Sequence, residues 1–396
     1  MISAAAWVYL VAAHGGFWLT GQRLPPGSPP GEAPSERTWP AVAAVVPARN
    51  EAESLPVTLP ALLAQDYPGE FRVFVVDDNS DDGTGAIAAE LGEKAARDGG
   101  APLTVVKGQP RPDGWAGKVW AMTQGFAAAT AGTGTLPEYV LFTDADISWA
   151  PHALRDLVRS AAADDRGLVS QMALLRAETW WERVIVPAFV YFFAQLYPFR
   201  KVNDPASRTA GAAGGCMLVK RSVLADAGGL DKIKGALIDD VALGTLLKRH
   251  GSRTWLGLTT DIKSARPYPD LASLWHMIAR SAYVQLRYNP LLLAGTIVGL
   301  LVLYVAPVAG TLAAVIAAAT GATGAAVALT GIAGLVGWAL MTASYVPMLR
   351  LYGLSPFRAP TLPLIAALYA AMTADSARRH YSGRAVSWRG RTAARV

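Results

Sequence analysis

Short apolar runs alternate with amphipathic stretches through the middle of the chain. Apolar runs that predict buried strands cover residues 41–46, 71–76, 103–106 and 139–142. Helical periodicity covers residues 84–98 and 118–130, and a polar loop after the first strand opens another helix with Asn50 as its cap. Strands that alternate with helices in this way predict an α/β fold, in which helices cover a mainly parallel sheet.

Both ends of the chain contain long uncharged apolar segments, unlike the short apolar runs of the central region. Residues 288–349 contain no Lys, Arg, Asp or Glu, and at 1.5 Å per residue they cross a ~30 Å hydrocarbon core at least twice. Pro307 and residues 321–324 are both candidate breaks. If residues 288–349 form two spans, the last apolar stretch, residues 361–373, is re-entrant or interfacial. If they form three spans, that stretch crosses the membrane. The uncharged segment 3–20 lacks a signal peptide's basic start and cleavage site, and it predicts a retained anchor.

Composition and charge agree with a membrane enzyme whose central domain faces the cytoplasm. Of 396 residues, 52% are hydrophobic and 17% charged, which leaves room for one large domain plus membrane segments. Arginines flank the central region on the inner side of each predicted span, so the positive-inside rule places that region in the cytoplasm of the cell (inner) membrane. The net charge of +6 gathers near the carboxyl end, where anionic headgroups explain it more simply than nucleic acid does.

The single cysteine, Cys216, excludes an internal disulfide and agrees with a reducing compartment. A buried, small apolar side chain is the preferred interpretation of this residue, ahead of a reactive one.

Acidic pairs follow three apolar runs. Asp144 and Asp146 are spaced one residue apart, and on a strand that spacing places both carboxylates on one face, where they can bind Mg²⁺ or Mn²⁺. The pairs 77–78 and 239–240 also follow apolar residues. Because α/β sheets bind ligands outside the carboxyl ends of their strands, we expect the three pairs to form one cleft for a metal-bound diphosphate.

The residues in each loop suggest which part of a nucleotide ligand that loop binds. Asp77 or Asp78 can accept hydrogen bonds from a base or ribose, and the neighbouring segment that contains Pro47, Arg49 and Glu51 can reach the same nucleotide. Neither a Gly-x-Gly-x-x-Gly motif nor a phosphate loop is present, which disfavours dinucleotide and P-loop binding. Lys118 begins a predicted helix, so it is a candidate diphosphate contact, although a surface lysine fits equally well.

An aromatic stretch from Trp180 to Phe199 is closed by Arg200 and Lys201. Core packing explains such residues in general. Beside membrane segments we prefer an interfacial portal for an apolar acceptor.

In their order, these motifs resemble the family 2 glycosyltransferases, which have the GT-A fold. The likeness covers about residues 41–258 and includes residues 47–51, 77–78, 117–118, 144–146, 214–215 and 239–243. The resemblance implies that Asp77 or Asp78 binds the base, that Asp144 and Asp146 bind metal and diphosphate, and that Asp240 is the general base. It also assigns Gly215 and Asp239 to the donor site, although Asp239 is equally suited to capping the helix.

The apolar ends, with residues 285–288 and 383–391, look like the hopene-associated glycosyltransferases, near bacterial ceramide glucosyltransferases. Of the Gln/Arg-x-x-Arg-Trp motif found in processive synthases the chain keeps only Arg280, which argues against a polymer synthase. Arg280 is either a diphosphate clamp or a juxtamembrane charge. The expected segments are an anchor (1–21), a linker (22–40), a GT-A catalytic domain (41–260), an interfacial segment (261–290), transmembrane helices (291–349), a short membrane segment (350–375) and a basic cytoplasmic tail (376–396).

The expected reaction is transfer of a sugar from a nucleotide-diphosphate donor, UDP-sugar first, to a lipid of the bilayer. With Asp240 as base and no second nucleophile, one in-line displacement inverts the anomeric centre. A hopanoid acceptor is implied only by the resemblance, and a polyprenyl phosphate, ceramide or diacylglycerol competes with it. A catalytically silent scaffold is disfavoured by the intact acidic residues, and a lipid transporter by the small number of spans.

Overall fold

A computed structural model of the 396-residue chain describes residues 1–25, 39–131, 135–382, 387–388 and 391–392. The chain divides into two compact units. The α/β unit comprises residues 22–176, 201–267 and 387–396, and the helical unit comprises residues 1–21, 177–200 and 268–386. Residues 177–200 therefore cluster with the helical unit, although they lie inside the range expected for the catalytic domain. Most of the expected linker, residues 26–38, and part of the basic tail, residues 383–386, 389–390 and 393–396, lie outside the described residues.

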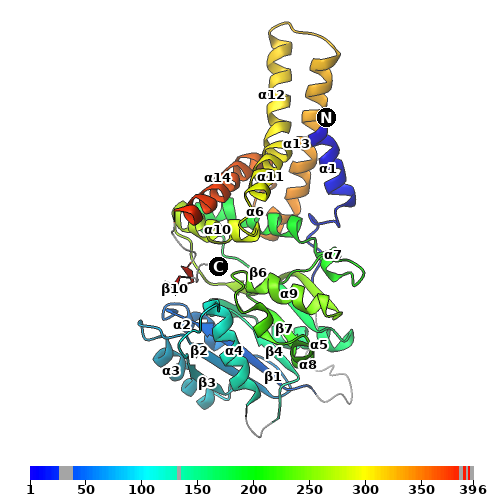
Figure 1. Cartoon of the computed structure of the whole chain (residues 1–396). Coiled ribbons are helices and arrows are strands. Elements are labelled where there is room, and N and C mark those ends of the chain that lie inside the picture. The colour runs from blue at the N-terminus through cyan, green and yellow to red at the C-terminus, as the bar shows by residue number, and fades with distance from the viewer. Residues whose placement is uncertain (26–38, 132–134, 383–386, 389–390, 393–396) are drawn as a thin grey trace. The chain divides into compact units, whose positions relative to one another are not determined.

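The α/β unit contains an eight-stranded sheet (Figure 1). In chain order its strands are β1 (Val42–Ala48), β2 (Phe71–Asp77), β3 (Leu103–Lys107), β4 (Tyr139–Phe142), β5 (Ile147–Trp149), β6 (Leu168–Leu174), β7 (Met217–Lys220) and β8 (Thr254–Ser264). Their order across the sheet is β3-β2-β1-β4-β7-β6-β8-β5.

The sheet is mixed but mainly parallel, as expected, and only β5 and β7 run against the other six strands. Strands β3, β2, β1 and β4 run parallel, as does β6 beside β8. Strand β7 is antiparallel to both β4 and β6, and β5 is antiparallel to β8. A strand buried on both faces has the same apolar pattern in either direction, so the sequence does not reveal this reversal.

Helices cover both faces of the sheet and bury its strands. All seven residues of β1 are buried. One face packs on α2 (Leu55–Leu63), α3 (Thr84–Arg97) and α5 (Ala153–Ala163), and the other on α4 (Gly117–Thr130), α8 (Arg221–Asp226), η1 (Leu230–Ile233) and α9 (Asp239–Arg249).

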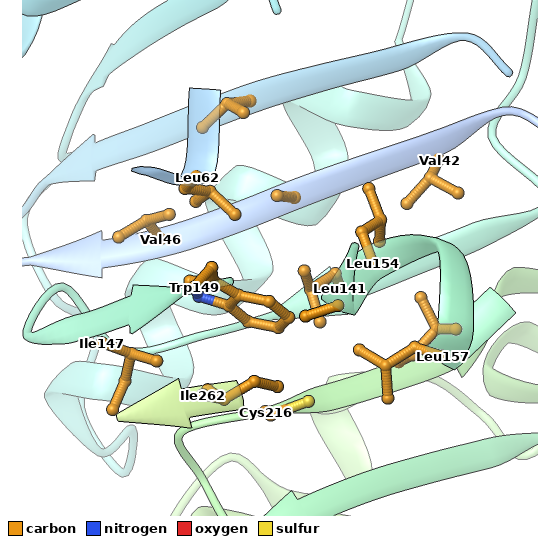
Figure 2. Packing of buried hydrophobic residues seen from close by; sticks show 14 of the residues in the cluster. Val42, Val46, Leu62, Leu141, Ile147, Trp149, Leu154, Leu157, Cys216 and Ile262 are labelled. Atoms are coloured by element: carbon orange, nitrogen blue, oxygen red, sulfur yellow. The ribbon is translucent and has the colours of Figure 1, made fainter. Parts of the chain in front are cut away.

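Figure 2 shows the packing on the first of these faces, where Trp149 lies beside Leu141 and Leu154. Cys216 belongs to the same core and is fully buried, as expected. Burial raises the pKa of its thiol to about 12, so the thiol stays protonated at neutral pH.

The helical unit contains two helices that are long and apolar enough to cross a membrane, Pro290–Ala319 and Ala325–Leu351. Its elements are α1 (Ile2–Ala13), α6 (Trp180–Leu196), α10 (Leu271–Gln285), α11 (Pro290–Leu300), η2 (Leu301–Val305), α12 (Ala306–Ala319), α13 (Ala325–Leu351), η3 (Pro356–Thr361) and α14 (Leu362–Tyr381). A further short helix, α7 (Phe199–Asn203), spans the division between the units. The break between the two long helices falls at residues 321–324, and Pro307 lies within the first of them.

The amino-terminal helix α1 is shorter than a span. Its 12 residues reach about 18 Å at 1.5 Å per residue, and the chain turns at Gly15 and Gly16, whose φ angles are +69° and +60°. The retained anchor expected over residues 3–20 stays a prediction, and its helix is shorter than one straight span. Two glycines in the left-handed region end the helix before it reaches the required length.

Most of the aromatic rings of α6 pack inside the helical unit. The Tyr191 ring lies 5.2 Å from the rings of both Phe17 and Tyr345, and the Phe192 ring lies 4.8 Å from that of Tyr369. These contacts favour the core-packing interpretation over an interfacial portal. Trp180, at the start of the helix, is 60% exposed.

Candidate active site

Loops at the carboxyl ends of β1, β2 and β4 carry the predicted site residues Arg49, Glu51, Asp78, Asp144 and Asp146. Strand β4 ends at Phe142, and Asp144 and Asp146 occupy the turn that leads to β5. The prediction that both carboxylates lie on one face of a strand is therefore wrong, because the strand ends before the first of them. The hydroxyl of Thr143 donates to the carbonyl of Gly215 at 2.8 Å, which ties this turn to the segment before β7.

Lys118 joins two of the acidic pairs. It lies in the first turn of α4, and its Nζ is 2.7 Å from Asp144 Oδ1 and 3.0 Å from Asp239 Oδ2. Burial alone lowers the pKa of Lys118, but the two carboxylates outweigh it and raise that pKa above its ordinary value. The anions beside Lys118 in the structure are the protein's own carboxylates, and the expected contact with a diphosphate stays a prediction.

The pair Asp239 and Asp240 forms the first turn of α9. No strand precedes it, and Ile238 is the cap residue, without a side-chain hydrogen bond, so the idea that Asp239 caps the helix is wrong. Asp240 Oδ2 accepts a hydrogen bond from the amide of Gly214 at 2.9 Å, and its Oδ1 accepts one from the amide of Val241 at 2.7 Å.

Gly214 is a site residue that the sequence reasoning left without a role. A Cβ at this position would lie 3.1 Å from Lys118 Nζ, 3.4 Å from Asp240 Oδ2 and 3.6 Å from Asp144 Oδ2. The backbone of Gly214 thus lies beside Lys118, Asp144 and Asp240, and Lys118 joins Asp239 to the same cluster. The predicted Gly215 is its neighbour and contributes the carbonyl that accepts from Thr143.

The carboxyl group of Asp240 has a pKa suited to proton transfer near neutrality. Burial and the neighbouring Asp239 raise it to about 7, against the opposing effects of Lys118 and the two amide hydrogen bonds. Burial also raises the pKa of Asp144, and Asp146 adds to this shift, whereas Lys118 opposes it. A carboxyl group with a pKa near the working pH is the one best placed to accept and release a proton.

Arg266, just beyond the end of β8, was not predicted. Its Nε lies 2.5 Å from Asp146 Oδ2, and its Nη2 lies 2.9 Å from Glu51 Oε1. Asp146 and Glu51 are 8% and 6% exposed, respectively. The available signal was weak, since Arg266 is a basic residue two positions after a strand, without any motif around it.

The loops after β1 and β2 are bonded to each other. Arg49 Nη1 donates to the carbonyls of Asp78 and Asn79 at 2.5 and 2.9 Å, and the amide of Asn50 donates to Ser80 Oγ at 3.1 Å. Asn50 and Asn79 have φ angles of +52° and +55°. Asn50 therefore belongs to this loop pair, and the cap position of α2 falls to Ser54, which corrects the prediction for Asn50.

Three further predicted residues lie in or directly after β1 and β2. Pro47 is buried within β1, Asp78 is fully buried, and the amide of Ser80 donates to Asp77 Oδ1 at 3.0 Å. Arg280 is exposed on α10 of the helical unit, so its role as a diphosphate clamp stays a prediction. The structure thus brings Pro47, Arg49, Glu51, Asp77, Asp78, Lys118, Asp144, Asp146, Gly215, Asp239 and Asp240 into the α/β unit.

The acidic residues fit a divalent cation that is shared with a phosphate ligand. Among the described residues, no group of three or more His, Cys, Asp and Glu side chains is placed to hold a metal by itself. Asp146 is nevertheless close enough to Asp144 to contribute to the raised pKa of the Asp144 carboxyl group. Mg²⁺ is commonly bound through one or two carboxylates, with substrate phosphates and water completing the shell.

Comparison with known proteins identifies the domain. Residues 43–228 match the family model described as Glycosyl transferase family 2. An N-acetylglucosaminyltransferase of Mesorhizobium japonicum is 40% identical over 65 residues, which cover 16% of this chain and 15% of that protein. A 4,4'-diaponeurosporenoate glycosyltransferase of Staphylococcus haemolyticus is 32% identical over 135 residues, which cover 34% of this chain and 32% of that protein. The chain thus spans about a third or less of the length of these relatives.

A mannosyltransferase of Pyrobaculum calidifontis, solved in complex with GDP-Man and Mn²⁺, resembles the whole chain. The TM-score is 0.52 at 23% identity, over 95% of this chain and 98% of that one, which shows a shared fold. Residues 43–228 thus resemble glycosyltransferase family 2, and the α/β unit has a GT-A-like fold, in agreement with the expected glycosyltransferase. Asp240 and Arg266 lie beyond the matched residues, so their roles are argued from geometry.

Proposed function

We propose that the chain is an inverting, metal-dependent glycosyltransferase that moves a sugar from a nucleotide-diphosphate donor to a membrane lipid. The observation that carries the proposal is the convergence of Lys118, Asp144, Asp239 and Asp240 around the Gly214 backbone. This cluster combines a cation for a leaving diphosphate, carboxylates for a metal, and a carboxyl group with a raised pKa for an incoming hydroxyl.

Departure of the diphosphate is the first requirement of the reaction. Negative charge grows on the leaving oxygen as the anomeric bond breaks, and fixed cations stabilise that charge. Asp144 and Asp146 would hold Mg²⁺ or Mn²⁺, which supplies Lewis-acid stabilisation to the leaving diphosphate when bound. Lys118 adds a positive charge at the start of α4, where the helix dipole also favours an anion.

Attack by the acceptor is the second requirement. The acceptor hydroxyl loses its proton as it attacks, and Asp240 in its ionised form can take that proton on Oδ2 or Oδ1. Because Asp240 acts as a base and no covalent sugar intermediate is needed, a single displacement from the opposite face inverts the anomeric centre. Gly214 and Val241 hold the Asp240 carboxylate in place through their amides.

The donor and the acceptor are proposed from separate arguments. UDP-sugars come first for the donor, and GDP-mannose is a second candidate because the solved mannosyltransferase holds GDP-Man and Mn²⁺. A lipid acceptor is supported by the two helices that are long and apolar enough to span a membrane. A hopanoid rests on the family resemblance alone, and a polyprenyl phosphate, ceramide or diacylglycerol is tested beside it.

Nucleotide release tests the function directly. Purified protein would be incubated with a UDP-sugar or GDP-mannose, Mn²⁺ and extracted lipid, while free nucleotide and labelled lipid are measured. We expect release that depends on both metal and lipid, and that is lost in Asp240→Asn. Nucleotide binding without release from any of these donors would instead identify a catalytically silent scaffold and overturn the proposal.

A further inference from the structure

We propose that Arg266 is a positioning residue, which holds Asp146 and Glu51 in the arrangement that a metal-bound donor requires. This inference rests on the proposed donor site and adds to it a residue that no motif assigns. Arg266 is placed by the sequence just after β8, while Asp146 follows β4 and Glu51 follows β1. One guanidinium group thus connects three segments that are distant in the sequence.

The geometry of the contacts requires an arginine. Nε binds Asp146 Oδ2 at 2.5 Å, and Nη2 binds Glu51 Oε1 at 2.9 Å. A guanidinium is planar and rigid, so two of its nitrogens can direct hydrogen bonds to two carboxylates at a set separation. A lysine ammonium is a single point charge on a flexible stem, and it cannot fix that separation in the same way.

Because Asp146 and Glu51 are buried, the positive charge of Arg266 matters as well as its geometry. Asp146 and Glu51 are both less than 10% exposed, and their carboxylates share this cation. Removing the partner of a buried charge leaves that charge without compensation. Loss of Arg266 would remove a positive charge that both buried carboxylates contact, and one guanidinium group would no longer set their separation.

The turn that carries Asp146 is braced by its backbone too. The amide of Ala265 donates to the carbonyl of Asp146 at 2.8 Å, so the segment that contains Arg266 holds this residue at both the main chain and the side chain. The hydroxyl of Thr58 donates to the carbonyl of Ala145 at 2.6 Å. Glu51 is fixed through its own amide, which donates to Thr84 Oγ1 at 2.8 Å. Rigid anchors on both sides allow Arg266 to set the carboxylate positions.

The hydrogen bond from Arg266 would affect metal binding because it orients the Asp146 carboxylate, a proposed metal ligand. Carboxylates that bind metals are themselves hydrogen-bonded, and loss of such an outer partner typically costs about 10- to 100-fold in metal affinity. Arg266 therefore need not touch the donor in order to control how tightly a metal-bound nucleotide is held.

The test compares Arg266→Gln, Arg266→Lys and a control, Arg155→Gln. Arg155 in α5 forms an ion pair of 2.7 Å with Asp66, which the proposed site does not use. Affinities for UDP and GDP would be measured by calorimetry with and without Mn²⁺, together with thermal unfolding. We expect Arg266→Gln to lose about 10- to 100-fold in affinity with Mn²⁺ and little without it. Arg266→Lys should fall between this variant and the parent, and Arg155→Gln should bind like the parent.

Several outcomes would overturn the inference. Parental affinity in both Arg266 variants would show that the bonds have no role in binding. Equal losses with and without Mn²⁺, together with a lower unfolding temperature, would show a purely structural role. Tighter Mn²⁺ binding by Arg266→Gln in the absence of nucleotide would show that Arg266 competes with the metal. If Arg266→Gln does not fold, parental binding by Arg266→Lys decides against the proposal. A parent protein that binds neither nucleotide refutes the proposed function instead.

Discussion

The environment of Lys118 explains how a lysine is tolerated at the start of a helix. The partial positive charge at a helix N-terminus disfavours a cation there. Asp144 and Asp239 reverse that preference, since both lie within 3.0 Å of the ammonium. A diphosphate that enters the proposed site would meet a lysine that is already charged, and one of its two carboxylate partners, Asp144, is also a candidate metal ligand.

Metal-dependent donor binding should need both carboxylates of the turn after β4. Asp144→Ala or Asp146→Ala removes an oxygen ligand from the proposed metal site, so affinity for UDP in the presence of Mn²⁺ should fall while the fold stays intact. Lys118 keeps Asp239 as a partner in the first variant. Calorimetry with and without Mn²⁺ measures the effect, and unchanged metal-dependent affinity in both variants would falsify the assignment.

The identity of the base is tested by Asp240→Asn. The amide keeps the size of the side chain but cannot take a proton, so sugar transfer should fall by about 10²- to 10⁴-fold while UDP binding persists. Rates of transfer and nucleotide affinities provide the two readouts. If Asp240→Asn transfers normally and Asp239→Asn is inactive, the two roles are exchanged. Normal transfer by both variants places the base elsewhere.

The raised pKa of Asp240 predicts a pH dependence of definite sign. The base works in its ionised form, so kcat/KM should rise with pH up to about 7 and level off above it. A carboxyl group at the ordinary value of 3.8 would give a flat profile between pH 5 and pH 8 by the same reasoning. The residual activity of Asp240→Asn should lack this rise with pH. If the rise persists in that variant, another titrating group is responsible for it.

At the scale of elements, α4 can carry Lys118 to the cluster because it packs very closely on the sheet. Gly125 faces that sheet, and a Cβ there would lie 2.4 Å from Val45 Cγ1 and 2.8 Å from Val76 Cγ2. Both neighbours are core residues of β1 and β2. The helix therefore approaches the strands more closely than any larger residue would allow.

Gly125→Ala should destabilise the α/β unit although alanine is the better helix former. Forcing a methyl group into this contact costs about 1–3 kcal/mol, which exceeds the gain of about 1 kcal/mol from helix propensity. Ala127→Gly, at an exposed position of the same helix, measures the propensity effect alone. Denaturant unfolding of both variants gives the comparison, and a Gly125→Ala protein more stable than the parent would contradict the close packing.

At the scale of the whole molecule, the apolar helices predict a membrane protein with its catalytic chemistry on one side. Arg280 and Arg287 precede the first long apolar helix, and Arg378 and Arg379 lie in the last turn of α14. An even number of crossings between these two groups keeps both on the same side. By the positive-inside rule we predict that this side is cytoplasmic, where nucleotide sugars are available.

Cysteine labelling checks this topology. The segment from Gln22 to Tyr288 and the tail after Asp375 should both be cytoplasmic. In a Cys216→Ser background, Asp81→Cys introduces one thiol at an exposed loop position. An impermeant reagent should label this thiol in inverted vesicles and leave it unlabelled in intact cells. Labelling in intact cells reverses the orientation.

The sequence alone determined most of what depends on neighbouring residues. The strands at residues 71–76 and 139–142 and the helix at 84–98 were placed to within a residue, because burial and periodicity are local signals. The order of the acidic motifs indicated the resemblance that the family model also finds over residues 43–228. The absence of charge from residues 288–349 predicted at least two crossings, and two long apolar helices lie there.

The tertiary structure decided whatever depends on residues far apart in the chain. The direction of β7, the hydrogen bond from Gly214 to Asp240 and the contacts of Arg266 with Asp146 and Glu51 all connect distant segments. A buried strand has the same pattern whichever way it runs, and an arginine outside any motif carries no sign of its partner. Long-range packing chooses these pairings, because it alone sets which charges lie together away from water.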